Sequence, residues 1–132
     1  MIGIVVVSHG QVAVELVKAA QTIVGEIPAI AAVSIGWSDD VTVAHDAIVK
    51  AMAEVGGGDT LIFTDMFGGT PTNVSLPFLS SQVEIVTGVN LPMLIKVSSL
   101  REGDLLEVAR AIRDQGRDAI SVATEVLGRR PV

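Results

Sequence analysis

The sequence predicts an α/β domain with a doubly wound, mainly parallel sheet of about five strands and helices on both faces. Short apolar runs alternate with segments of helical periodicity along all 132 residues, which is typical of βαβ units with right-handed crossovers. The runs are rich in valine and isoleucine, as in strands buried on both faces. Apolar residues make up 49% of the chain and charged residues 18%, enough for one core. We expect a single domain over residues 1–132.

The first half of the chain predicts two strand–helix pairs followed by a third strand. A β-branched run forms the first strand, 2–8, and apolar residues at helical spacing then indicate a helix that ends near Gly25. The apolar run 29–35 is the second strand. An aspartate of the next loop can cap a helix over 41–55, which three glycines stop. The third strand is the short run 60–64.

The second half repeats the pattern less regularly. A glycine-rich turn leads to Pro71, which fits the first position of a short helix. The fourth strand is 83–86, and residues 91–100 are irregular or form a short helix. Apolar residues at helical spacing indicate a helix over about 104–114. The run 119–123 is the candidate fifth strand.

Charge and composition exclude several classes of function. The net charge of −6 argues against a nucleic-acid-binding surface, which usually has a basic excess. The absence of cysteine excludes disulfides and thiolate metal sites. No apolar run reaches the length of a membrane span, and the amino-terminal run has no basic flank typical of a signal peptide. We therefore expect a cytoplasmic protein.

Two titratable side chains follow the strands between which a ligand is expected. In an open α/β sheet, ligands bind beyond the carboxyl ends of the strands, where the strand order reverses. In the flavodoxin-like order 2-1-3-4-5, the first and third strands are neighbours, and the helices after them lie on opposite faces. His9 follows the first strand and Asp65 follows the third. The topology therefore brings together two residues that are far apart in sequence.

His9 is the candidate phosphoryl acceptor. It precedes Gly10 at the start of a helix, where free backbone N–H groups and the helix dipole favour an anion. A carboxylate at Asp65 that accepts the other imidazole N–H would fix the tautomer and stabilise positive charge on the ring. The alternatives are purely structural: His9 merely ends a strand, and Asp65 caps the next helix or closes the turn.

The loop after Asp65 contains the candidate phosphate-binding residues. Gly68 and Gly69 allow a close approach of backbone to a ligand, Thr70 can cap the helix or bind a phosphate oxygen, and Asn73 can brace the loop. A tight turn with a good cap explains the same residues equally well. The patterns of a Walker A loop and of a dinucleotide-binding loop are absent. We expect no metal, ATP or other cofactor.

Several aromatic and sulfur-containing residues have two interpretations each. Trp37, in the loop after the second strand, packs in the core or rim, or is exposed and contacts a partner; packing is the preferred interpretation. Met66, Phe67 and Met93 form an apolar collar around the crevice, or pack as ordinary loop residues. His45 lies within a helix away from the crevice and is interpreted as a surface or half-buried helix residue.

The two segments that follow the first and third strands resemble a known family. Ser8-His9-Gly10, together with Thr-Asp-Met-Phe-Gly-Gly-Thr-Pro-Thr-Asn over residues 64–73, is similar to the IIA component of the mannose family of the bacterial sugar phosphotransferase system. The resemblance covers nearly the whole chain. It implies a phosphotransferase that carries phosphohistidine: His9 accepts the phosphoryl group on Nε2 from the phosphocarrier HPr, Asp65 orients His9, and Thr70 lies near the phosphate.

The resemblance also implies partners. The acceptor is a histidine of a IIB protein, expected as a separate chain because no linker and no fused IIB domain follow the fifth strand, and membrane IIC and IID components are only indirect partners. The resemblance further implies a homodimer whose subunits exchange an antiparallel last strand, here near 120–123. A regulatory sensor of phosphorylation state, which binds a target without sugar transport, would carry the same residues. A nucleotide-binding flavodoxin-like domain and the IIA-like unit of dihydroxyacetone kinase are less favoured alternatives. The sequence does not specify the sugar.

Overall fold

The computed structural model describes residues 1–129 and contains a four-stranded sheet. The strands are β1 (Gly3–His9), β2 (Ile30–Ile35), β3 (Thr60–Thr64) and β4 (Val83–Thr87). Their order in the sheet is β2-β1-β3-β4, and each neighbouring pair is parallel. This order reproduces the first four strands of the predicted 2-1-3-4-5 arrangement.

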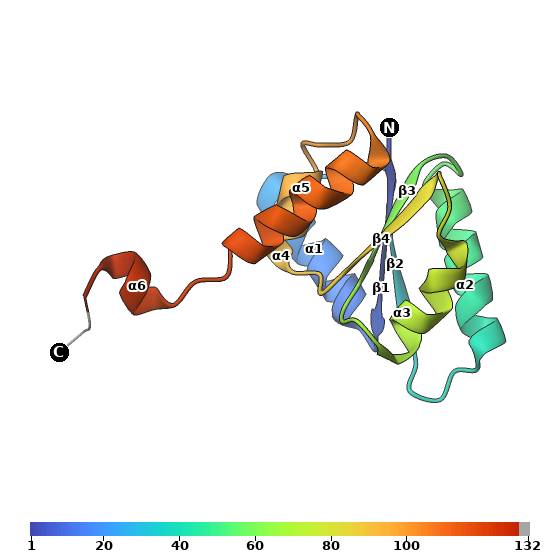
Figure 1. The fold of residues 1–132 in the computed structure, drawn as a ribbon. Helices are drawn as coiled ribbons and strands as arrows, with labels where there is room; N and C mark the ends of the chain where they lie inside the picture. The colour runs from blue at the N-terminus through green and yellow to red at the C-terminus, as the bar shows by residue number, and fades with distance from the viewer. Residues whose placement is uncertain (130–132) are drawn as a thin grey trace.

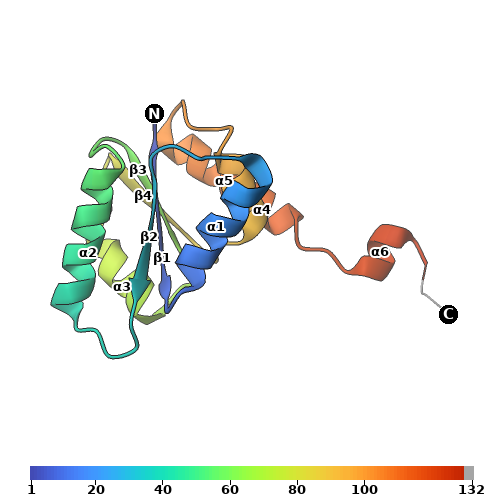
Figure 2. The ribbon, with the colours of Figure 1, turned by 180° about the vertical axis from the view of Figure 1, so that it is seen from behind.

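Helices cover both faces of the sheet, as predicted. They are α1 (Val12–Val24), α2 (Val41–Glu54), α3 (Gly69–Ser75) with a following 3-10 turn (Leu76–Phe78), α4 (Leu91–Val97), α5 (Leu105–Asp118) and α6 (Ala123–Leu127). Helices α1, α4 and α5 pack on one face, and α2 and α3 pack on the other (Figure 1; Figure 2 shows the reverse view). The helix after β1 and the helix after β3 therefore lie on opposite faces of the sheet. The strand order reverses between β1 and β3.

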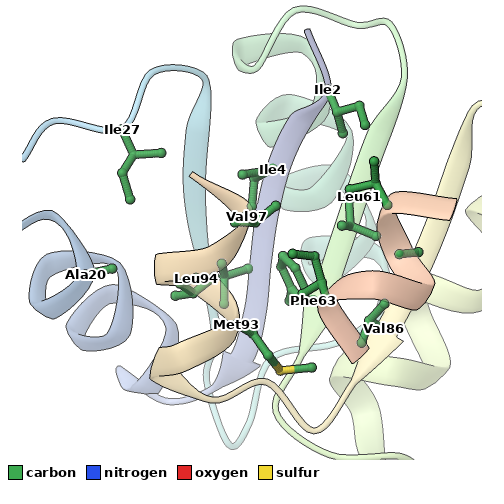
Figure 3. Close-up of a cluster of buried hydrophobic side chains, with 14 of the residues drawn as sticks. Ile2, Ile4, Ala20, Ile27, Leu61, Phe63, Val86, Met93, Leu94 and Val97 are labelled. Carbon is green, nitrogen blue, oxygen red and sulfur yellow. The ribbon is translucent and has the colours of Figure 1, made fainter. Parts of the chain in front are cut away.

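The core consists of two aliphatic layers separated by the sheet. Side chains alternate across a strand, so Ile4 and Val6 of β1 face α1, α4 and α5, whereas Val5 and Val7 face α2 and α3. Figure 3 shows the first layer, in which Phe63 packs among leucine, isoleucine and valine side chains. All four of the β1 side chains are fully buried. A continuous apolar run in the sequence is thus explained by a strand with no solvent-facing side.

Side-chain caps fix the two longest helices, which begin close to where the sequence predicted. Asp40 accepts a hydrogen bond from the backbone N–H of Val43 at 2.8 Å, and Asp104 accepts one from Glu107 at 3.1 Å. Helix α5 extends beyond the predicted end, to Asp118. Gly116 packs against Met93, because a Cβ at position 116 would lie 2.6 Å from that side chain. Gly116 therefore serves close helix packing and does not end the helix.

A buried arginine joins the amino-terminal ends of β1 and β2. The Arg101 guanidinium donates hydrogen bonds to the carbonyl oxygens of Ile2, Pro28 and Ala29 at 2.7, 2.6 and 3.0 Å. Burial lowers the pKa of Arg101, and the neighbouring Glu102 carboxylate opposes that shift. The guanidinium stays charged near neutral pH. This anchor lies at the end of the sheet opposite His9.

The predicted fifth strand is not formed in the structure. Residues 119–122 have no regular structure, and the chain then leaves the body of the domain as an arm that ends in α6 (Figure 1). Ile120 and Val122 are 76% and 59% exposed. A strand needs a neighbour to pair its backbone groups, and within the described chain no strand lies beside this segment. The resulting sheet has four strands, all parallel, rather than five.

No helix in the described part of the chain is both long enough and apolar enough to cross a membrane.

Candidate functional site

His9 and Asp65 meet at the carboxyl edge of the sheet. Val7 of β1 pairs with Thr64 of β3, so the residues that follow these two positions lie side by side. Asp65 Oδ2 lies 2.7 Å from His9 Nδ1 and also accepts the backbone N–H of His9 at 2.9 Å. Its other oxygen, Oδ1, accepts the backbone N–H of Met66 at 3.0 Å. The carboxylate is therefore fixed by hydrogen bonds to both of its oxygens.

This contact determines which nitrogen of His9 is available for chemistry. An ionised carboxylate can only accept hydrogen bonds, so His9 Nδ1 carries the proton in the contact with Asp65. In a neutral imidazole the lone pair then resides on Nε2. The side chain of His9 is 23% exposed, so a visiting molecule can reach it. The site presents a nucleophilic Nε2 on an oriented ring.

Gly69 lies beside the Nε2 edge of the imidazole. A Cβ at position 69 would lie 3.1 Å from His9 Cε1 and 3.3 Å from Nε2. The backbone φ of +79° is also one that residues with a side chain rarely adopt. Gly69 therefore keeps the space next to Nε2 open. The close approach of this backbone to a ligand stays a prediction.

Trp37 covers one face of the His9 ring. The two ring centroids are 5.2 Å apart and the planes are inclined by 20°, which is a stacked arrangement. The preferred interpretation from the sequence is packing in the core or rim. The indole is 84% exposed, so the core is wrong and Trp37 lies at the rim. The register explains its place: Ile35 of β2 pairs with His9, and Trp37 follows two residues later.

Thr72 supports the loop that carries Asp65. Its buried hydroxyl donates to the carbonyl oxygen of Met66 at 2.5 Å, so Thr64 Oγ1, 2.8 Å away, is the donor in the second hydrogen bond. The residue before Asp65 and the residue after it are thereby fixed. Sequence reasoning missed Thr72, although Thr72 lies on the buried face of α3 with Val74 and Ser75.

The other predicted loop residues lie near the site but differ in their contacts. Gly10, after β1, packs against Trp37, because a Cβ at position 10 would lie 4.0 Å from the indole nitrogen. Gly68 precedes α3 with a φ of +83°. Thr70 and Asn73 are exposed, and neither side chain hydrogen-bonds to another residue within 1–129. The helix begins at Gly69, so Pro71 is its third residue and not its first.

The surroundings of His9 form an exposed rim. Phe67 is 75% exposed and Met66 is half exposed, whereas Met93 is buried in the core and belongs to no collar. Exposed apolar side chains around a nucleophile are typical of a surface that contacts another protein.

The other titratable side chains of the described chain do not add to this site. His45 lies on α2, where its ring stacks on Phe78 with the ring centroids 5.0 Å apart. Among residues 1–129, no three His, Cys, Asp or Glu side chains are grouped as metal ligands.

The first turn of α1 leaves fewer free amides beside His9 than the sequence suggested. Ser8 Oγ accepts the backbone N–H of Ala13 at 2.6 Å, so this group is occupied. The helix has no side-chain cap at Gln11. The remaining amides of the turn and the helix dipole still favour an anion at this end.

The amino-acid sequence of this chain matches a known protein family. Residues 3–112 match the family model EIIA-man, described as PTS system fructose IIA component. The chain is 30% identical over 122 residues to the fructose-specific EIIA component of the phosphotransferase system (PTS) of Bacillus subtilis (strain 168), covering 87% of this chain and 84% of that protein. It is 33% identical over 97 residues to the sorbose-specific EIIA component of Lacticaseibacillus casei, covering 72% and 70%.

The fold also resembles a solved structure over nearly the whole length of both chains. The mannose/sorbose-specific IIA subunit of the phosphotransferase system from Enterococcus faecalis superimposes with a TM-score of 0.85 at 29% sequence identity. The match covers 92% of this chain and 93% of that one.

Proposed function

This chain belongs to the EIIA-man family of IIA components of the sugar phosphotransferase system, and from that premise we propose that it accepts a phosphoryl group from HPr on His9 and passes it to a histidine of a separate IIB protein. The observation that carries the proposal is the free Nε2 of a ring whose Nδ1 is bound to Asp65 at 2.7 Å. The relay works in the cytoplasm, and membrane IIC and IID components act only after IIB.

The proposed reaction needs no proton to leave His9. The Nε2 lone pair forms a bond to phosphorus while the phosphorus–nitrogen bond of the donor phosphohistidine breaks, and the electron pair of that bond returns to the donor ring. His9 keeps the proton on Nδ1, so its ring becomes positively charged. The Asp65 carboxylate lies against that proton and stabilises the charge. Transfer to IIB is the same step in reverse.

Positioning supplies the rest of the catalysis. Phosphoryl transfer depends mainly on in-line alignment and on groups that stabilise the phosphate oxygens. Gly69 leaves room at Nε2, and the first turn of α1 follows His9 directly. The exposed hydroxyl of Thr70 is available for a phosphate oxygen because no other residue within 1–129 occupies it. Gly10 follows β1, Gly68 precedes α3, and Asn73 is an exposed residue of α3.

The exposed rim supports partner proteins as donor and acceptor. Trp37 stacks on the His9 ring, and Phe67 lies in the loop that follows Asp65. Both side chains are more than two-thirds exposed. A carrier must bind and release its partners quickly, which a small, partly apolar contact surface allows. We assign this rim to the docking of HPr and IIB in turn.

The direct test is phosphorylation of His9→Gln. Wild-type protein incubated with phosphoenolpyruvate, HPr and the first enzyme of the system should gain one acid-labile, base-stable phosphate, which mass spectrometry should locate at position 9. His9→Gln should gain none because glutamine has no nucleophilic ring nitrogen. His45→Gln, which changes the other histidine of the chain, is the matched control and should be phosphorylated like wild type. Full phosphorylation of His9→Gln would end the proposal.

We also propose that two copies of the chain form a dimer through their arms. A groove of about 250 Å³ lies between residues 84–87 of the edge strand β4 and Ala109, Arg110 and Arg113 of α5. On the side away from β3, β4 has no partner strand within residues 1–129. The exposed segment 119–122 leaves its own domain next to α5 and is long enough to add a strand to a neighbouring copy. In the dimer each arm would form the antiparallel fifth strand of the other subunit.

An acidic substitution in the arm tests the dimer. Val122→Asp places a charge in the proposed strand and should raise the dimer dissociation constant by about tenfold or more, because burial of an unpaired charge is costly. Analytical ultracentrifugation over a dilution series measures this constant. Val49→Asp, on the exposed side of α2, is the control and should dimerise normally. Equal dissociation constants for Val122→Asp and wild type would exclude the arm from the interface.

A further inference from the structure

We propose that Trp37 is a positioning residue for phosphoryl transfer, and that its indole holds the plane of the His9 ring and stabilises the positive charge that the ring acquires. The inference rests on the proposed function of His9. It is carried by the stacked geometry, with ring centroids 5.2 Å apart and planes inclined by 20°. Asp65 contacts the ring in its plane and Trp37 contacts its face, so the two residues restrain different motions of the imidazole.

The loop that carries Trp37 is closed by hydrogen bonds on both sides of the indole. The backbone N–H of Gly36 donates to Asp39 Oδ2 at 2.8 Å, and the N–H of Asp39 donates back to the carbonyl oxygen of Gly36 at 3.1 Å. Ile35 before the loop pairs with His9, and Asp40 after it caps α2. The indole therefore projects over the imidazole from a short, restrained turn.

The charge on the ring gives the stack a chemical role. The π-face of an indole attracts a cation more strongly than that of any other side chain. Phosphorylation at Nε2 with the proton retained on Nδ1 converts the neutral imidazole to a cation. The stack is therefore stronger in the phosphorylated state, and in the transition state that leads to it, than in the resting protein. A docked partner would exclude water from the exposed indole and increase this difference.

A role in folding does not account for this tryptophan. Trp37 is 84% exposed and stacks on the His9 ring. Burial of so little area contributes little to folding stability. Substitutions at position 37 should therefore leave the domain folded, so that changes in rate can be measured on native protein.

The experiment compares Trp37→Leu, which keeps apolar bulk without a ring, with Trp37→Phe, which keeps a ring. Two phosphoryl donors are used: phospho-HPr and phosphoramidate, a small donor that releases ammonia and needs no protein docking. With phosphoramidate, Trp37→Leu should react about two- to fivefold more slowly than wild type. With phospho-HPr, its kcat should fall by about tenfold, and its KM should rise as well because Trp37 also belongs to the docking rim. Trp37→Phe should lie between wild type and Trp37→Leu with both donors.

Tryptophan fluorescence provides a second readout. Trp37 is the single tryptophan of the chain, which also lacks tyrosine, so emission excited at long wavelength comes from the indole over His9. Phosphorylation by phosphoramidate should change this emission in proportion to the phosphate on His9. His9→Gln treated in the same way should show no change.

The outcomes separate this inference from the proposed function. If wild type gains phosphate on His9 but Trp37→Leu matches it in phosphoramidate rate and in kcat, the positioning role is excluded and the relay function stands. A raised KM for phospho-HPr with unchanged kcat also overturns the inference, because it assigns Trp37 to docking alone. If wild type gains no phosphate at position 9 from either donor, the proposed function fails and this inference fails with it.

Discussion

Replacement of Asp65 by asparagine should lower the rate of phosphoryl uptake by about a hundredfold or more while the domain stays folded. The amide has nearly the same shape as the carboxylate, but it cannot neutralise a positively charged imidazole. If its NH₂ group faces Nδ1, it also stabilises the tautomer that has the proton on Nε2, which removes the nucleophile. The initial rate of phosphate transfer from phospho-HPr, with folding checked by circular dichroism, measures the effect.

The chain contains its own control for this substitution. His45 and Asp46 form a second histidine–aspartate contact, with Nδ1 and Oδ1 3.3 Å apart, but it is exposed and lies on α2. Asp46→Asn should therefore transfer phosphate at the wild-type rate. An unchanged rate for Asp65→Asn would show that Asp65 only closes the turn, which is its purely structural alternative.

Gly69→Ala should have the second large effect, a loss of phosphoryl uptake by about tenfold to a hundredfold. The new Cβ would lie 3.1 Å from His9 Cε1 and 3.3 Å from Nε2, closer than ordinary contact. The ring cannot easily move away because Asp65 binds its Nδ1 and Trp37 covers its face. The methyl group also occupies space next to the atom that must receive phosphorus. The rate of phosphate uptake from either phospho-HPr or phosphoramidate, divided by the amount of folded protein, measures the loss.

Gly88→Ala separates the contact with His9 from backbone strain. Gly88 has a φ of +78°, almost the same as the +79° of Gly69, and no atom lies within 4 Å of the position that a Cβ would take there. Both substitutions should therefore destabilise the fold by about 1–3 kcal/mol. Only Gly69→Ala should slow phosphorylation. Equal uptake rates for the two variants would show that the Cβ at position 69 does not obstruct Nε2.

The meeting of His9 and Asp65 could be predicted from the sequence because it depends on the order of strands. Alternating apolar runs and helices indicate a doubly wound sheet, and in the flavodoxin-like order 2-1-3-4-5 the first and third strands are neighbours. The structure places Nδ1 and Oδ2 2.7 Å apart across 56 positions of sequence. No side-chain detail is needed for this prediction, since parallel strands with a fixed order determine which loops are neighbours.

The loop residues were harder to assign because their roles depend on where α3 begins. The sequence suggested Pro71 as the first helical residue, which placed Thr70 at the position of a cap. The helix begins at Gly69 instead, so Thr72 turns inward and its hydroxyl joins Thr64 to Met66. Thr70 is thus a helical residue, and two residues that are two positions apart on a helix point more than half a turn apart. Thr72 therefore faces the protein while Thr70 is exposed.

The sequence also suggested two features that the structure does not show, a fifth strand in the arm and a core position for Trp37. The run 119–123 has the composition of a strand, but a strand also requires a partner, and residues 1–129 supply none beside it. Tryptophan is a large apolar side chain that is often buried, but the loop that carries Trp37 lies at the edge of the sheet. The indole there is 84% exposed. Residue types indicate which structures a segment can form, whereas the elements packed beside it determine which structure it adopts.

The sequence by itself determined the α/β class, because hydrophobic periodicity is a local property of the chain. It also placed a histidine and a carboxylate after two strands that are neighbours once the flavodoxin-like order is adopted. Only the tertiary structure decided which imidazole nitrogen is free, that an indole covers the ring, and that Gly69 leaves its Nε2 edge open. These features depend on distances of a few ångströms between segments far apart in sequence, and such distances are set by the packing of the whole domain.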